Sequence, residues 1–481
     1  MLVSFLLSRK RNFHIIPATL LTMVLVLAFS CDDVKKEQIA FVKGKIVNPK
    51  NGVVVLTNYQ NVNDTIALNM ENEFTLNLKK VSKPGLYTFW HATEYQSIYI
   101  EPGDSIALFV DTKSFDESLA FSSGHAKENN YLIDMFVKME EANKAFLPQY
   151  KKEPAAFLDL ITARANKQIE QLHKDAKKQN FSKDFVPIVE QIIWLNNYNK
   201  KERYVAAHCG SSAKPCTAKV PETFYDHRKT IDLEDVDYLN NNSFKAYLNS
   251  LIANKTREKL LERKINSSNL SYALTRLQVT NDLLLNDTMR ELYLLNYTRN
   301  YLRNAKDQET PQAVLKSYLS LSKNKNNQAF MQAFAASFKT TRTGNDLADL
   351  LLKNDADNEV MLGAIVAKPT IIYYWSSKDE TYNMQVHLTV ADLRKKYPEL
   401  DFIGINTDDG NSANWRNALK SMDLETKNEY QVASNNNYNL SNVLMGSKRA
   451  ILIDEDLTIL DSNLNLLHYK IETTLLGYVS K

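Results

Sequence analysis

The spacing of apolar residues changes twice along this 481-residue chain, and this change limits the possible folds more than any other feature. Between residues 36 and 121, apolar residues alternate with polar ones or form short runs that end at Gly, Asn, Asp or Pro, as in strands joined by turns. Between residues 129 and 340 they recur every three to four residues, which is typical of helices. From residue 347 onward, strand-like and helix-like stretches alternate. The chain is too long for one ordinary core, so we expect a multidomain α+β protein.

These changes predict three domains. An N-terminal antiparallel β-domain, built as a sandwich or open barrel, is expected over residues 31–122, and a helical middle domain over residues 123–344. A C-terminal α/β domain is expected over residues 345–481. Its predicted elements are a strand at 369–375, a helix at 383–397, a strand at 400–408, a helix at 414–422, a β-hairpin at 449–463 and a terminal helix at 469–480. A β-α-β unit followed by a helix, a hairpin and a helix is the thioredoxin topology.

The N-terminus has the features of a targeting signal. Arg9, Lys10 and Arg11 precede the apolar run IIPATLLTMVLVLAFS, which ends at Cys31 and is followed by two aspartates. The stretch LAFSC resembles the lipobox of bacterial lipoproteins, in which the cysteine after the cut carries the lipid. The resemblance implies a signal peptide over residues 1–30 and a protein held by lipid on Cys31 in the cell envelope, at the periplasmic or outer face of the outer membrane. A plain membrane anchor or a conventional signal peptide are the alternatives.

The net charge argues against nucleic acid as a partner. The formal charge is +3, and the three basic residues before Cys31 account for all of it, since no acidic residue precedes that cysteine. A mature chain with no net charge lacks the basic surface that phosphate binding requires. The sequence also contains no glycine-rich loop of the kind that cradles phosphates.

Two parts of the chain resemble known families. The stretches YIEPGDSIALFVD and FSSGHAKENNYL resemble the DUF4369-like β-domain of Bacteroidota lipoproteins, a likeness that implies a tight turn but no chemistry. The stretches AKPTIIYYWSSKDETYNM, NWRNAL and RAILIDEDLTIL resemble the TlpA/ResA-like branch of the thioredoxin superfamily. That resemblance implies a thioredoxin-like fold for the C-terminal domain. It also implies a redox turn with two cysteines and a facing cis-proline.

The residues at the redox positions depart from this family. Asp379 and Tyr382 occupy the positions of the two cysteines, and Lys448 occupies the position of the cis-proline. Neither a carboxylate nor a phenol can form a mixed disulfide. Ser377 and Glu380 match a capping box, which predicts that this turn has become a stabilised helix start. The alternative is acid–base or metal chemistry at Asp379 and Glu380, but no histidine at suitable spacing joins them, and we expect no metal or cofactor.

The remaining cysteines, Cys209 and Cys216, bracket a loop in the helical domain. In an oxidising envelope such a pair is expected to form a local disulfide. A metal site that includes His208 and a redox switch are the alternatives.

The sequence therefore favours a redox-inactive binding or scaffold protein over an enzyme. The partner would be an envelope protein or peptide, held by a groove at Trp375, Asp379, Glu380, Tyr382 and Lys448 or by the β-domain. The first alternative is a TlpA/ResA-like thiol-disulfide oxidoreductase that uses the non-standard cysteines Cys209 and Cys216. The second is a chaperone that holds unfolded clients.

Overall fold

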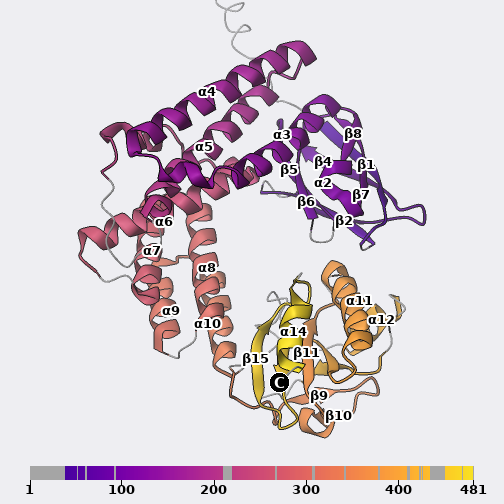
Figure 1. The fold of residues 1–481 in the computed structure, drawn as a ribbon. Coiled ribbons are helices and arrows are strands. Elements are labelled where there is room, and N and C mark those ends of the chain that lie inside the picture. Colours follow the sequence, from indigo (N-terminus) through magenta and orange to yellow (C-terminus); the bar gives the residue numbers. More distant parts are fainter. Residues whose placement is uncertain are drawn as a thin grey trace, which may run out of the picture.

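The computed structural model describes most of the chain beyond residue 37. The described residues are 38–50, 52–59, 62–91, 94–209, 219–265, 268–305, 309–340, 343–377, 380–408, 412–421, 424, 426–433, 450–468 and 470–479. They form an N-terminal pair of β-sheets, a helical middle region and a C-terminal mixed sheet with helices, as Figure 1 shows. The predicted multidomain α+β class is confirmed.

The N-terminal part is a sandwich of two four-stranded sheets. Its strands are β1 (Gln38–Val47), β2 (Val53–Asn58), β3 (Val62–Ala67), β4 (Glu73–Val81), β5 (Gly85–His91), β6 (Glu94–Ile100), β7 (Ser105–Asp111) and β8 (Ala120–Ser123). One sheet has the order β4-β1-β7-β8 and the other the order β3-β2-β5-β6. Alternate side chains of both sheets, such as Val42, Leu56 and Phe89, meet in one apolar core.

One strand pair of the sandwich departs from the antiparallel prediction. β1 and β7 run parallel, with Phe41 beside Ser105 and Val47 beside Asp111. A parallel pair requires a crossover connection, and here the chain between them forms β4 of the same sheet and four strands of the other. The remaining pairs of both sheets are antiparallel.

The middle region is helical, as the apolar spacing predicts. Its helices are α3 (Ala126–Lys144), α4 (Pro154–Gln179), α5 (Phe185–Cys209), α6 (Asn242–Glu262), α7 (Asn269–Leu283), α8 (Asp287–Asn304), α9 (Glu309–Leu321) and α10 (Lys325–Thr340). Two of the 3-10 segments in this region are η2 (Leu147–Lys151) and η3 (Glu222–Lys229). Helix α9 was not predicted, although Val314 and Tyr318 have helical spacing and are buried.

The C-terminal part has the topology predicted for a thioredoxin-like domain. Strand β11 (Thr370–Trp375), helix α11 (Glu380–Lys396) and strand β12 (Asp401–Asn406) form a parallel β-α-β unit, and helix α12 (Ser412–Ser421) follows. Strands β14 (Ala450–Ile453) and β15 (Ile459–Leu464) form the hairpin, and α14 (Ile471–Val479) is the terminal helix. Strands β9 (Leu351–Lys353), β10 (Glu359–Met361) and β13 (Glu429–Val432) were not predicted and extend the sheet on the far side of β12.

The two faces of this sheet belong to different cores. Ile371, Tyr373 and Trp375 alternate along β11 and pack with residues of α11, α12 and α14. The intervening Ile372 and Tyr374 belong to a second cluster, which also contains buried residues of helices α7 to α10. The segment between α10 and β11 adds residues such as Leu347 to the same cluster, so the helical region and the C-terminal sheet share one continuous core.

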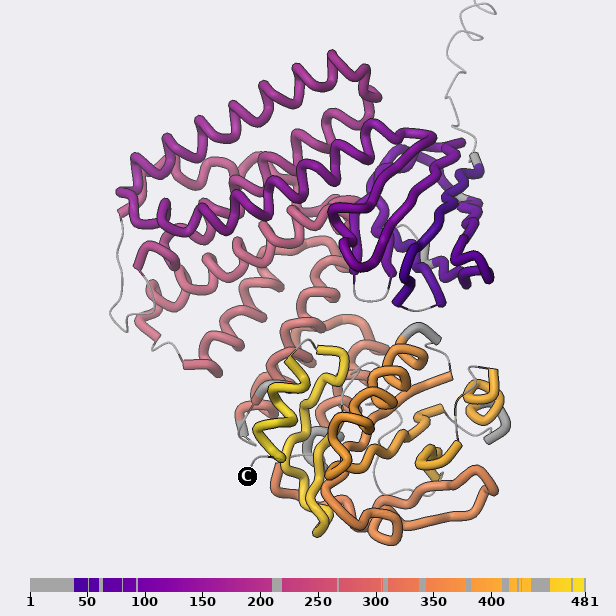
Figure 2. Tube along the Cα trace, turned by 45° about the vertical axis from the view of Figure 1, so that its right-hand side comes forward, coloured from indigo at the N-terminus to yellow at the C-terminus, as the bar shows by residue number. Residues whose placement is uncertain are grey.

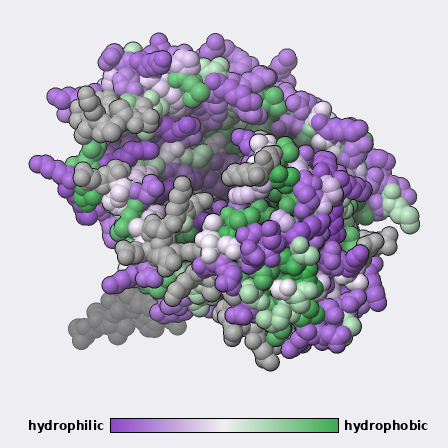
Figure 3. All heavy atoms as spheres, turned by 60° about the horizontal axis from the view of Figure 1, so that its bottom comes forward, coloured by the Kyte–Doolittle hydropathy of each residue, from purple (hydrophilic) through white to green (hydrophobic). Residues whose placement is uncertain are grey.

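The outer surface is mostly polar on the face drawn in Figure 3, where hydrophobic residues form separate groups around a hollow. Among the described residues, no helix has the length and apolar character needed to cross a membrane. Figure 2 shows the C-terminal part beside the lower helices and apart from the uppermost helix.

A buried carboxylate ties three helical segments together. Glu202 of α5 receives hydrogen bonds from Arg228 at 2.8 and 2.7 Å, and from the side-chain amide of Asn254 on α6 at 2.8 Å. His227 Nε2 lies 2.9 Å from the same carboxylate. Burial alone would raise the pKa of Glu202, but these donors and the Arg228 charge outweigh burial and lower the pKa to about 2. The network therefore fixes η3 against α5 and α6.

Replacing Glu202 by Gln should destabilise the helical region by about 3 kcal/mol, because a buried guanidinium loses its fully buried partner. Glu258 is the matched control, since it also pairs with Arg228 but its side chain is 33% exposed. The Glu258→Gln change should cost less than about 1 kcal/mol. Urea unfolding, with hydrogen exchange to locate the effect, measures both variants. Equal losses would show that the buried network does not hold η3 in place.

Candidate functional site

The turn after β11, where a redox motif would lie, is held by a carboxylate from the neighbouring strand. Asp408, just beyond β12, receives hydrogen bonds from the Ser376 hydroxyl and from the Ser377 backbone N–H and hydroxyl at 2.7 and 2.5 Å. Asn406 donates to the same carboxylate at 3.1 Å. Burial would raise the pKa of Asp408, but these donors outweigh burial and lower it. These hydrogen bonds attach Ser376 and Ser377 to the end of β12. Helix α11 begins three residues after Ser377, at Glu380.

Of the five residues predicted to form a groove, the structure describes the side chains of two, and both are buried. Trp375 is 2% exposed and Tyr382 is 5% exposed, and both pack in the core under α11. Tyr382 therefore fills space inside the domain at the position where the family has a cysteine. Asp379 and Lys448 lie outside the described residues, as does the side chain of Glu380. The two aromatic side chains are therefore too buried to line a groove at this turn.

Beneath the turn lies a second buried carboxylate, Glu429 of β13. The Tyr373 hydroxyl donates to it, and Trp375 Nε1 donates at 2.9 Å. His387 Nε2 of α11 lies 3.4 Å from the same carboxylate. Burial and the Glu429 charge together raise the pKa of Tyr373 well above its ordinary value, so the phenol stays protonated as a donor.

His387 is bonded to its own helix. Its Nδ1 lies 2.8 Å from the backbone oxygen of Asn383, which can only accept, so Nδ1 carries a hydrogen. Its Nε2 is buried without a hydrogen-bond partner, 3.4 Å from the Glu429 carboxylate. Because the side chains of His387 and Glu429 are at most 5% exposed, neither has direct access to a substrate in solution.

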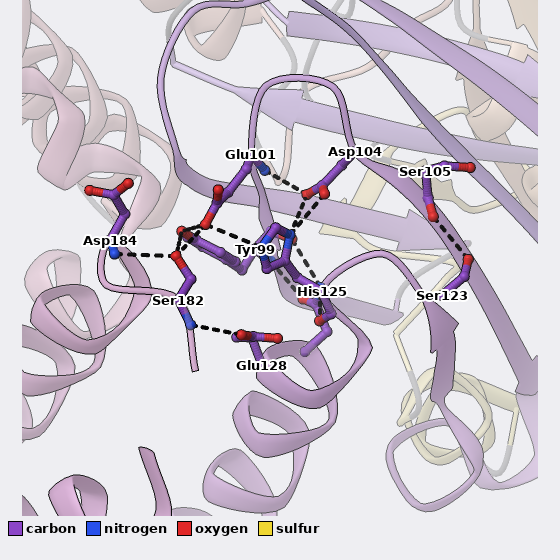
Figure 4. Close-up of polar contacts among 10 residues, drawn as sticks. Tyr99, Glu101, Asp104, Ser105, Ser123, His125, Glu128, Ser182 and Asp184 are labelled. Atoms are coloured by element: carbon purple, nitrogen blue, oxygen red, sulfur yellow. Dashed lines mark hydrogen bonds and ion pairs between the residues drawn. The ribbon is translucent and has the colours of Figure 1, made fainter. Parts of the chain in front are cut away.

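A third polar cluster joins the β-sandwich to the helices (Figure 4). His125, just before α3, places Nδ1 2.8 and 2.9 Å from the two oxygens of Asp104 and Nε2 3.3 Å from Glu101. The Tyr99 hydroxyl donates to Glu101 at 2.6 Å, and the Ser182 hydroxyl between α4 and α5 donates to the same carboxylate. The hydrogen bond to Asp104 raises the pKa of His125 despite partial burial. The EPGD turn is thus clamped to two helical segments.

The sequence did not single out His125, which reads as one of several scattered histidines. The turn that it contacts was expected from the EPGD stretch. In the structure, Gly103 adopts a positive φ of 85° between Glu101 and Asp104. A tight turn of fixed shape brings two carboxylates to one side, and the histidine follows 21 residues later along the chain. The cluster fits a junction rather than a catalytic site, because each polar group is already bonded to a neighbour.

Of the three cysteines, only Cys209 is among the described residues. Cys209 ends α5 and is disulfide-bonded. Cys31 and Cys216 lie outside the described residues, so the lipid site and the bond between Cys209 and Cys216 remain predictions. His208 places Nδ1 2.8 Å from the backbone oxygen of Tyr150. Within the described ranges, no group of three or more His, Cys, Asp or Glu side chains is arranged to hold a metal ion.

Comparisons with known proteins give a fold-level likeness alone. No family model matches the chain, and no curated protein matches it. A thioredoxin-like protein from Bacteroides caccae is 13% identical, with 56% of this chain and 96% of that chain covered and a TM-score of 0.30. The thioredoxin domain of a thiol-disulfide oxidoreductase from Bacteroides vulgatus is 17% identical, with 29% and 98% covered and a TM-score of 0.23. Values this low do not bear on activity, and the thioredoxin-like description rests on strand order and connections.

Replacing Gly404 by Ala should destabilise the C-terminal part by about 1–3 kcal/mol, since overpacking a filled core has costs in this range. A Cβ at Gly404 would lie 1.9 Å from Glu429 Oε2, and that carboxylate is held by Tyr373 and Trp375. Gly477→Ala in α14 is the matched control, because its Cβ would meet no atom within 4 Å. Urea unfolding measures both variants. Equal stability of the two would contradict the confinement of Glu429.

The junction cluster should make stability depend on pH near neutrality. The pKa of His125 is raised in the folded state, so its contribution is fully present below the unfolded value of about 6.5 and is lost as pH rises through the folded value. His125→Gln should remove this part of the pH dependence, whereas the exposed His468→Gln should not. Thermal unfolding followed from about pH 5.5 to about 8.5 covers the window. An unchanged profile for His125→Gln would rule out this role.

Proposed function

We propose that this protein is a lipid-anchored lipoprotein of the cell envelope, at the outer membrane, whose thioredoxin-like domain binds a protein or peptide partner without exchanging disulfides. The lipid would be carried by Cys31, and the β-sandwich or the exposed part of the turn before α11 would contact the partner. No cofactor enters this function, and neither does nucleic acid.

The observation that carries the proposal is the state of the turn between β11 and α11. Residues 345–481 contain no cysteine, so this domain has no thiol with which to attack a disulfide. Ser376 and Ser377 are fixed by Asp408, and Tyr382 is packed in the core. A redox turn needs an exposed, reactive thiolate. A turn without such a thiolate supports a binding surface rather than a redox centre.

The alternative is a thiol-disulfide oxidoreductase that uses Cys209 and Cys216. Cys209 lies at the C-terminal end of α5, and Figure 1 shows this end of the helical region well apart from α11. A cysteine there would act without the helix start and the facing loop that activate thiols in thioredoxin-like domains. A local disulfide that closes the loop between α5 and η3 accounts for the same cysteines.

The purified chain should not reduce insulin disulfides above the rate of dithiothreitol alone. The Cys209→Ser variant should behave identically, because a structural disulfide does not turn over. Ser377→Ala is a matched variant of the turn that should also leave the rate unchanged. Turnover that disappears in Cys209→Ser would refute the binding proposal and establish the oxidoreductase.

Crosslinking in intact envelopes tests the partner. A defined protein recovered with the wild-type chain, and lost when Asp379 and Glu380 are both replaced by Lys, would support binding at the turn. Recovery of many unfolded polypeptides, together with suppression of client aggregation, would favour the chaperone instead.

A further inference from the structure

A cavity of about 930 Å³ lies between α3 and α4, with Ile193 of α5 on its lining. Helix α4 packs along α5, whereas α3 packs against β6 and β8 of the sandwich. The two helices thus pack against different neighbours, and the cavity lies between them. Its volume lies within the range typical of ligand pockets. We refer to this cavity as the α3–α4 groove.

The α3 side of the groove is apolar and adaptable. Met135 and Met139 of α3 line it, and Leu160 of α4 lies one turn beyond Arg164, while two lysines, Lys138 and Lys167, also line the groove. Methionine side chains adjust to irregular apolar partners at low cost. Gln168 and Gln171 of α4 also line the groove. Gln168 Oε1 accepts a hydrogen bond from Asn197, and Gln171 Nε2 donates one to Asp175. The Gln168 N–H groups can still donate to a peptide backbone, and the Gln171 oxygen can still accept from one.

One end of the groove is basic and lacks a counter-ion. Arg164 lines this end, and its Nε is buried without a hydrogen-bond partner. Arg164 Cζ lies 5.6 Å and Lys200 Nζ lies 5.4 Å from the centre of the Phe146 ring, so two cations share one aromatic neighbour. Burial and the charges of Arg164 and Arg203 lower the pKa of Lys200 to about 7. Among the described residues, no carboxylate forms an ion pair with Arg164 or Lys200. A bound anion would relieve this repulsion.

The other end of the groove is acidic. Asp134 of α3 and Asp175 of α4 line it together with Tyr131. Burial, and then the Asp175 charge, raise the pKa of Tyr131 to about 12. Arg164 and Asp175 are eleven residues apart on α4, which corresponds to about 16 Å along the helix. An extended peptide of about five residues has the same length.

We propose that the α3–α4 groove binds a short apolar peptide with free termini, with its carboxylate at Arg164 and its amine at Asp134 and Asp175. Apolar peptide side chains would contact Met135, Met139 and Leu160, and the glutamine amides would bond to the peptide backbone. A fatty acid would use the basic end and the apolar α3 side but would leave the two aspartates without a role. The groove is separate from the turn before α11, so this inference holds or fails independently of the proposed function.

The test is retention of a synthetic mixture of pentapeptides built from leucine, methionine, phenylalanine, valine and alanine, with free termini. The full purified chain should retain a subset of these, identified by mass spectrometry. Titration calorimetry with a retained peptide should show about tenfold or greater weakening after C-terminal amidation, as expected for the loss of a charge-assisted hydrogen bond. N-terminal acetylation should have a similar effect.

Variants of groove residues test which end of the groove binds each terminus of the peptide. Arg164→Gln should weaken the free peptide about tenfold and remove the penalty of amidation, and Asp175→Asn should remove most of the penalty of acetylation. Lys174→Gln, on an exposed position of α4 outside the groove, is the matched control and should bind like wild type. Circular dichroism confirms that each variant is folded. Failure to retain any peptide, equal binding of capped and free peptides, or binding of oleate that peptides do not displace would each overturn the proposal.

Discussion

Two buried carboxylates determine the form of the C-terminal part. Asp408 and Glu429 lie beneath the end of β11, and each is surrounded by donors because a charge inside a protein is tolerated only when it is bonded. Asp408 fixes the backbone of Ser377, and Glu429 accepts hydrogen bonds from Tyr373 and Trp375. A disulfide-exchanging turn must open its surface to a substrate. Here Ser376 and Ser377 instead donate to the carboxylate of Asp408.

The same principle acts in the other two parts of the chain. Glu202 draws η3 onto α5 and α6, and Glu101 and Asp104 draw α3 and the α4–α5 connection onto the sandwich. In each case a carboxylate receives donors from elements far apart in sequence. Apolar packing provides the bulk of the stabilisation, and these few polar contacts select the relative placement of the elements.

The sequence revealed the elements more readily than their contacts. Strand β11 was predicted to within one residue of its observed bounds, because it is an apolar run with clear breaks on both sides. The parallel pairing of β1 with β7 was missed, since pairing between distant strands leaves no local pattern. Glu429 in EYQV reads as a surface acid, and its burial beneath Tyr373 and Trp375 depends on strand pairing that the sequence does not reveal. The burial of Tyr382 depends on α11 packing that spacing alone does not reveal.

The continuous core that joins helices α7 to α10 with one face of the C-terminal sheet has a consequence for the history of the chain. Ile372 and Ile403 on that face share their apolar surroundings with Leu294 and Phe334 of the helices. A gene segment for the C-terminal part alone would encode a sheet with one apolar face exposed to water. Recombination could therefore exchange the sandwich more easily than the C-terminal part, and the two regions that share this core are expected to have diverged as a single inherited unit.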